Sequence, residues 1–140
     1  MSDFSVFMAG SATNETVKYV ASKRFQIKGK PVEWELKAVS SDLDELIRKE
    51  CTKKVPIAGK RGAYNQETDT DKYIGKLCVA CTVYPNLKDA ELQDSYGVKD
   101  ADALLKKMLL PGEYTDFKTK VMEVNGYDMS MEELVDEAKN

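Results

Sequence analysis

The clearest pattern in the chain is an alternation of apolar and polar residues that predicts β-structure near the N-terminus. The alternating residues are Val32, Trp34, Leu36 and Ala38 on the apolar side, and Glu33, Glu35 and Lys37 on the polar side. A period of two gives a strand one buried face and one wet face. Phe25 and Ile27 alternate in the same way, and residues 28–31 between the two runs have turn composition. We therefore expect a β-hairpin over residues 24–39, with Val17 and Tyr19 in a third strand.

From residue 41 onward the apolar positions recur every three or four residues, which predicts helices. The six candidate segments begin near Ser41, Thr70, Leu87, Asp100, Glu113 and Ser130. Helix stop signals lie at Pro85, Gly97, Pro111 and Asn125. The segment that begins at Asp100 has the widest apolar face, and we expect Pro111 and Gly112 to close it.

Together these elements predict an α+β fold that is predominantly α-helical. We expect a small N-terminal antiparallel β-hairpin or meander, packed on a bundle of about five helices. Residues 15–140 are expected to form one domain, with the hairpin in residues 24–39 and the helical part in residues 41–140. Residues 1–14 are expected to be a mobile arm. Residues 52–69, which contain Pro56, Gly59 and Gly62, are expected to be a solvated loop.

Charge is distributed unevenly along the chain. Residues 1–68 hold 12 basic and 9 acidic residues, a net charge of +3, whereas residues 69–140 hold 9 and 15, a net charge of −6. The acidic helical half disfavours contact with phosphate backbones, which require a basic patch. One basic cluster stands out, formed by Lys53, Lys54, Lys60 and Arg61. It keeps open an alternative function, a small nucleic-acid-binding or regulatory protein that uses the loop from Lys53 to Arg61.

Candidate catalytic or metal-binding chemistry is sparse. The sequence has no histidine, so the usual general base near neutral pH is missing. Cys78 and Cys81 have C-x-x-C spacing, but a structural zinc site needs about four ligands, and Cys51 is the only further cysteine. Both lie in an apolar helical pattern, which favours buried small residues over a redox or metal role. We expect no enzyme, no cofactor and no metal, and a carboxylate-based enzyme is the alternative that a polar pocket would support.

No run of about 18 apolar residues occurs, so the sequence predicts no membrane span. The N-terminal residues lack the basic and apolar regions of a secretory signal, so the expected compartment is the cytoplasm.

Several motifs in a fixed order resemble a known family. They are P-V-E-W-E-L-K at residues 31–37, V-x-P-N-L-K-D-A-E-L-Q at 83–93, L-L-K-K-M-L-L-P-G-E-Y at 104–114 and N-G-Y-D at 125–128. In this order they resemble the XkdN-like phage tail assembly chaperones, known from the prophage PBSX and from phages of Gram-positive bacteria. The resemblance covers about residues 16–140.

The resemblance implies a non-catalytic role in the host bacterial cytoplasm. Proteins of this family hold the tape measure protein soluble and help to recruit tail tube protein around it. Many are made in two forms, the longer by a programmed frameshift, so a longer form of this chain is an implied partner. A homo-oligomer is also left open.

A chaperone of a long, apolar-faced helical protein needs apolar grooves between its own helices. The candidate partner-binding residues lie near the end of the fourth segment and in the last one. They are Leu109, Leu110, Met131, Leu134, Val135 and Ala138. The alternative for each of them is that it fills the domain's own core.

Overall fold

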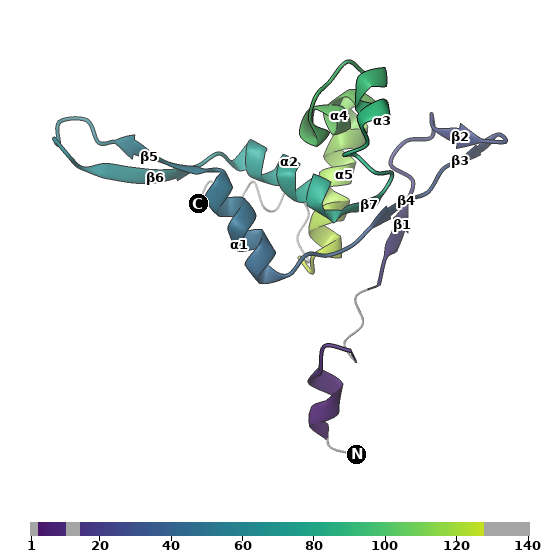
Figure 1. The fold of residues 1–140 in the computed structure, drawn as a ribbon, viewed down its shortest axis with the longest axis horizontal. Coiled ribbons are helices and arrows are strands. Elements are labelled where there is room, and N and C mark those ends of the chain that lie inside the picture. The colour runs from purple at the N-terminus through teal and green to yellow at the C-terminus, as the bar shows by residue number, and fades with distance from the viewer. Residues whose placement is uncertain (1–2, 11–14, 128–140) are drawn as a thin grey trace.

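The computed structural model describes residues 3–10 and 15–127 of the chain. The strands are β1 (Val17–Tyr19), β2 (Gln26–Ile27), β3 (Lys30–Pro31), β4 (Trp34–Leu36), β5 (Thr52–Pro56), β6 (Tyr64–Thr68) and β7 (Thr82–Tyr84). The α-helices are α1 (Ser41–Glu50), α2 (Thr70–Cys81), α3 (Ala90–Ser95), α4 (Ala101–Met108) and α5 (Pro111–Val124). A short 3-10 helix, Asp3–Phe7, precedes them. The expected α+β class is confirmed, with N-terminal strands packed against helices (Figure 1).

A three-stranded antiparallel sheet, in the order β1-β4-β7, forms the β part of the core. Its central strand β4 places Trp34 and Leu36 on the buried face. The expected third strand at Val17 and Tyr19 is present as β1, which pairs with β4. The expected hairpin is only partly present, because the β2–β3 hairpin ends at Pro31 and β4 pairs with β1 and β7 instead. The sequence could not show this pairing, since β7 comes almost fifty residues later.

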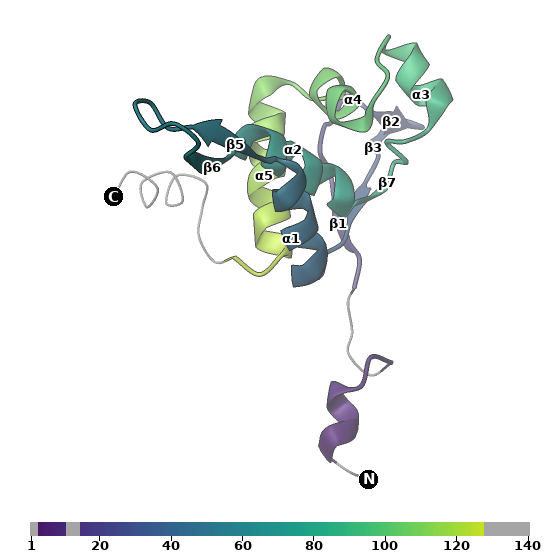
Figure 2. The ribbon, with the colours of Figure 1, turned by 60° about the vertical axis from the view of Figure 1, so that its left-hand side comes forward.

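Residues 52–69 differ from the expected solvated loop. They form a second hairpin, in which β5 and β6 pair antiparallel from Thr52 opposite Thr68 to Pro56 opposite Tyr64. Figures 1 and 2 show this hairpin projecting away from the helices, with its tip far from the rest of the fold. No residue of either strand is buried. The polar composition that indicated a loop therefore belongs to a hairpin with both faces exposed to solvent.

The core lies where the sheet meets α2, α4 and α5. Trp34 and Phe117 are 1% and 0% exposed, and their rings meet edge to face with centroids 5.5 Å apart. Leu77 of α2 and Leu104 of α4 are equally buried. Figure 2 shows α2 crossing in front of α5, and the two helices approach closely at Gly75, where an added Cβ would lie 3.5 Å from Tyr114 Oη.

The helix ends follow the predicted caps in most places. Ser40 and Asp100 cap α1 and α4, as their positions in the sequence indicate. Pro111 does not close α4 as expected but is the first residue of α5, a position that proline favours because its missing N–H is not needed there. The predicted last helix at Ser130 lies outside the described residues.

Candidate functional site

Helix α1 leaves part of its apolar face outside the core. Ser40 Oγ accepts a hydrogen bond from the backbone N–H of Leu43 at 3.4 Å, which fixes the start of the helix. Ile47 is 6% exposed and anchors the helix to the core, whereas Leu43 and Leu46 are 39% and 54% exposed. Leucines this exposed contribute little to folding, so they are available to a partner.

A groove of ≈ 380 Å³ lies beside these leucines, between α1, α2 and the start of α4. Its apolar lining consists of Leu43, Leu46, Ile47, Val79, Ala80 and Ala101. Its charged residues are Glu50, Lys76, Lys88, Asp100 and Asp102. Lys76 and Asp102 form an ion pair with an N–O distance of 3.6 Å. An apolar surface bordered by charges of both signs suits the apolar face of an amphipathic helix, with the partner's polar residues at the edge.

A polar cluster holds α1 against α2 and so fixes the shape of this groove. Asp44 accepts hydrogen bonds from the hydroxyl of Tyr73 and, at 2.9 Å, from Nε of Arg48. The Arg48 guanidinium also lies 4.3 Å from the centre of the Tyr73 ring. Burial alone would raise the pKa of Asp44, but the hydrogen bonds from Tyr73 and Arg48 outweigh it and the pKa is lowered. Burial, helped by the same hydrogen bond, raises the pKa of Tyr73.

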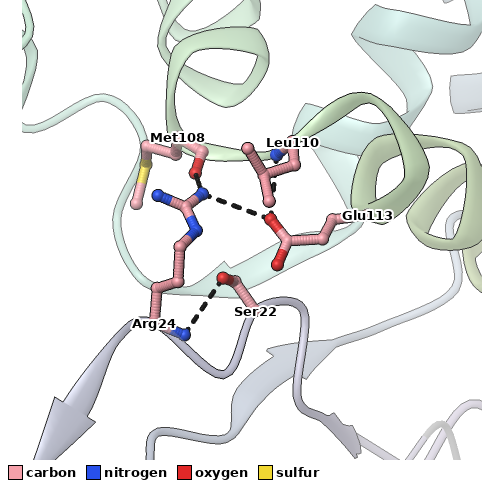
Figure 3. Close-up of polar contacts among 5 residues, drawn as sticks. All are labelled: Ser22, Arg24, Met108, Leu110 and Glu113. Atoms are coloured by element: carbon pink, nitrogen blue, oxygen red, sulfur yellow. Dashed lines mark hydrogen bonds and ion pairs between the residues drawn. The ribbon is translucent and has the colours of Figure 1, made fainter.

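The elbow between α4 and α5 is a second place where an apolar side chain is presented to solvent. Arg24, from the loop after β1, donates from Nη2 to the carbonyl of Met108 at 2.6 Å and to Oε1 of Glu113 at 3.2 Å (Figure 3). The same Oε1 accepts the backbone N–H of Leu110 at 2.8 Å. Ser22 accepts the backbone N–H of Arg24 at 3.2 Å. Leu110 therefore protrudes from a backbone that is held on both sides.

The predicted partner-binding residues separate into three groups. Leu109 is 5% exposed and lies in the core. Its neighbour Leu110 is 52% exposed at the elbow. The last four, Met131, Leu134, Val135 and Ala138, lie outside the described residues.

Sequence reasoning missed the α1 groove. The spacing of Leu43, Leu46 and Ile47 predicts one apolar face of a helix, and nothing in that spacing separates the buried isoleucine from the exposed leucines. The difference in exposure depends on where α2 ends and where α4 begins beside α1, which is a tertiary property.

The basic cluster lies on the β5–β6 hairpin. Lys53 and Lys54 belong to β5, near the base, and Lys60 and Arg61 lie in the turn. All four side chains are exposed. The hairpin therefore carries its positive charge away from the acidic helical body.

The C-x-x-C cysteines are part of the core, as expected. Cys78 and Cys81 are both 0% exposed. Burial raises the pKa of Cys78 to about 12 and also raises that of Cys81. Asn125 Nδ2 donates to Sγ of Cys81 at 3.3 Å, which ties the end of α5 to the end of α2. Within residues 3–10 and 15–127, no three His, Cys, Asp or Glu side chains are grouped to hold a metal ion.

In the part of the chain that the structure describes, no helix has both the length and the apolar character to cross a bilayer. The described surface thus offers an apolar groove, an exposed leucine at an elbow and a basic hairpin. These features are typical of a protein that acts by binding other proteins.

Comparisons with known proteins identify the family. The model of the phage XkdN-like tail assembly chaperone protein family matches residues 4–139. The chain belongs to this family. Two relatives from Bacillus subtilis strain 168 align over 99% of the chain: the uncharacterized protein YqbN, 36% identical over 93% of its own length, and the phage-like element PBSX protein XkdN, 30% identical over 94% of its length.

The fold is similar to a solved structure as well. The crystal structure of the protein YqbN has a TM-score of 0.75 and 31% sequence identity to this chain. The match covers 91% of this chain and 99% of the crystallised one. The resemblance deduced from the sequence motifs is therefore confirmed at the level of the family and of the fold.

Proposed function

We propose that this chain binds the tape measure protein of a long-tailed phage, keeps it soluble in the host bacterial cytoplasm, and promotes assembly of tail tube protein around it. The supporting observation is the apolar groove beside α1, in a member of a tail assembly chaperone family. A tape measure protein of the expected kind is long, helical and apolar-faced, and it would aggregate unless its apolar face were covered.

The groove matches one helix of such a partner. Leu43 and Leu46 would insert between partner side chains spaced three or four residues apart, and Ile47 and Val79 line the same groove. The charged border, with Lys76 and Asp102, would orient the partner helix without adding much affinity.

A second contact is proposed at the elbow, where Leu110 is exposed. Leu109 supports this position from the core. The apolar residues of the C-terminal segment, Met131, Leu134, Val135 and Ala138, are proposed as further partner contacts. Tail tube protein, a longer frameshifted form of the chain and a second copy of it are proposed as additional partners.

Co-expression with the tape measure protein tests the groove. The double variant Leu43→Glu/Leu46→Glu places two charges on the groove while leaving the buried Ile47 in place. We expect the tape measure protein to move from the soluble to the pelleted fraction, and to be lost from pull-downs of the variant chain. Burying a charged side chain against an apolar partner helix is strongly unfavourable.

Ile27→Glu is the control, because Ile27 is an exposed apolar residue (61%) on the distant β2–β3 hairpin, where a new charge lies outside the groove. It should leave the tape measure protein soluble. If the groove variant folds normally and still solubilises the tape measure protein as well as Ile27→Glu does, the groove is not the binding site.

One observation supports the alternative function of nucleic-acid binding: the four basic side chains of the β5–β6 hairpin are exposed. That function predicts binding to DNA or RNA that weakens steeply with salt. A gel shift at low salt that shows no complex removes it.

A further inference from the structure

The groove beside α1 contains two charged side chains that the fold leaves unpaired. Of its charged residues, Lys76 and Asp102 form an ion pair with an N–O distance of 3.6 Å, and Asp100 caps the start of α4. Glu50 and Lys88 remain. Both are exposed, and neither forms an ion pair with any residue in the described ranges 3–10 and 15–127. These two charges are therefore available to whatever occupies the groove.

Glu50 continues the apolar row of α1. It follows Leu43 by seven residues and Ile47 by three, a spacing that places side chains on one face of a helix. All three residues line the groove, as does Leu46. A partner helix that packs on the leucines therefore passes beside the Glu50 carboxylate.

The position of Glu50 is unfavourable for the unbound fold. Glu50 is the last residue of α1, and the C-terminal end of a helix carries a partial negative charge that disfavours an acidic side chain. The other charged residues of this turn are the bases Arg48 and Lys49, which pair with Asp44 at 2.9 Å and with Glu45 at 3.5 Å. No described residue offsets the Glu50 charge in the same way, whereas a cation from a partner would.

We propose that Glu50 is a specificity-determining residue of the groove, and that it selects partner helices with a lysine or arginine three or four residues beyond the end of their apolar stripe. This inference rests on the function proposed above and names the chemistry of the bound helix. The partner's apolar residues pack on Leu43 and Leu46, and its cation pairs with Glu50. A helix with an acidic residue at that place would meet both Glu50 and the negative end of α1, so it is rejected.

The rest of the lining agrees with a basic partner. The groove has three acidic residues, Glu50, Asp100 and Asp102, against the two lysines Lys76 and Lys88. Its net charge is therefore −1. A helix that instead carries an acidic residue would have to use Lys88, and this competing occupant predicts the opposite dependence on charge.

Binding of peptides from the tape measure protein tests the assignment. Labelled peptides of about twenty residues, which as helices span about 30 Å, would tile its sequence and be titrated with the full-length chain by fluorescence anisotropy. For the tightest peptide that Leu43→Glu/Leu46→Glu no longer binds, Glu50→Gln should raise the Kd about threefold, the effect of one exposed ion pair. Glu50→Lys should raise it about tenfold, since attraction becomes repulsion.

Two further readouts separate recognition by charge from a loss of structure. The effect of Glu50→Gln should nearly vanish in about 1 M salt, where the charge pair is screened. A peptide whose basic residue is replaced by glutamate should bind the Glu50→Lys variant more tightly than it binds the unmodified chain. Glu50→Gln should also raise the transition temperature of the unbound chain by about 1–3 °C, because it removes an acid from a helix C-terminus.

Glu123→Gln is the matched control. Like Glu50, Glu123 is an exposed acid in the last turn of a helix, but it pairs with Lys120 at 3.4 Å and does not line the groove. It should leave the peptide Kd unchanged and should not raise the transition temperature.

The outcomes distinguish this inference from the function on which it rests. If Leu43→Glu/Leu46→Glu abolishes binding but Glu50→Gln and Glu50→Lys bind the peptide as Glu123→Gln does, Glu50 has no role in recognition and the groove remains the binding site. If Lys88→Gln weakens binding and Glu50→Gln does not, the partner is acidic and the proposal is wrong. If no tape measure peptide binds the unmodified chain, the proposed function fails first and this inference falls with it.

Discussion

At the scale of single residues, the contacts of Asp44 explain how a ten-residue helix is held at a defined angle to its neighbour. Asp44 receives hydrogen bonds from Tyr73 of α2 and from Arg48 one turn further along α1. Tyr73 is 4% exposed, so its hydroxyl has little access to water as an alternative partner. The groove between α1 and α2 depends on this cluster.

Removing the Tyr73 hydroxyl tests the cluster. Tyr73→Phe should lower the free energy of unfolding by about 1 kcal/mol, the typical net contribution of one hydrogen bond, because Asp44 keeps its bond from Arg48. Urea denaturation followed by circular dichroism measures the change. Tyr84→Phe, at a residue that is 45% exposed, is the control and should have no measurable effect.

The cluster also predicts a dependence on pH. Because the folded pKa of Asp44 is lowered, its stabilising contribution is complete above the unfolded pKa of about 3.9 and is lost as the pH falls through the lower folded pKa. The difference in urea midpoint between the unmodified chain and Asp44→Asn should therefore be constant near neutral pH and shrink in acid. A difference that grows on acidification would contradict this assignment.

The buried cysteines give a chemical prediction. With its pKa raised to about 12, Cys78 carries almost no thiolate at neutral pH, and Cys81 shares its burial. Neither thiol should react with an aromatic disulfide reagent in the native chain, and both should react in denaturant. Rapid reaction of Cys78 or Cys81 without denaturant would show that the C-x-x-C pair is accessible and would reopen a redox role.

At the scale of elements, local signals were enough for the starts of α1, α2 and α4 and insufficient for strand pairing. Ser40 and Asp100 could be predicted as caps because a cap is decided by a side chain and the amides within three residues of it. Pro111 was assigned to the wrong helix, since proline both follows one helix and starts another. The end of α2 at Cys81 could not be predicted because Thr82 leaves the helix to pair with β4.

The β5–β6 hairpin escaped detection for a different reason. A strand is recognised in sequence by one apolar face, and this hairpin has none that is buried. Its strands are held by each other and by their attachment to α1 and α2. A side-chain bond between Thr52 and Thr68, with their Oγ1 atoms 2.7 Å apart, closes the base.

Shortening the hairpin tests this view. Replacing residues 54–66 by an Asn-Gly turn should change the free energy of unfolding by less than about 0.5 kcal/mol, as for a surface change that removes no buried residue. Thermal unfolding by calorimetry measures this. A loss of more than about 2 kcal/mol would mean that the hairpin supports the core.

At the scale of the whole molecule, one core holds the sheet and the helices together while the surface carries the binding features. The candidate site could be predicted only in part. The sequence predicted Leu110 as a partner contact, and the structure leaves this side chain exposed, whereas the exposure of Leu43 and Leu46 could be seen only in the packed structure. Family membership could be predicted from the order of four motifs, two of which lie on the core strand β4 and at the α4–α5 elbow.

A substitution at Phe117 tests whether the sheet and the helices share one core and unfold together. It is 0% exposed and touches both Trp34 of β4 and Tyr19 of β1. Phe117→Ala should cost about 3–5 kcal/mol and lower the transition temperature of sheet and helices together. Phe7→Ala, at a residue that is 77% exposed, should leave the transition unchanged. Two separate transitions in the Phe117 variant would show that the strands and the helices unfold independently.

The central position of Trp34 has a practical consequence. It is the only tryptophan in the chain, and its indole is 1% exposed against α5, away from the α1 groove. The protein thus carries an intrinsic fluorophore whose emission shifts to the red when the core opens. A ligand that covers the groove should leave that emission in place. A single titration monitored by tryptophan fluorescence can therefore distinguish a partner that binds the folded protein from one that unfolds it.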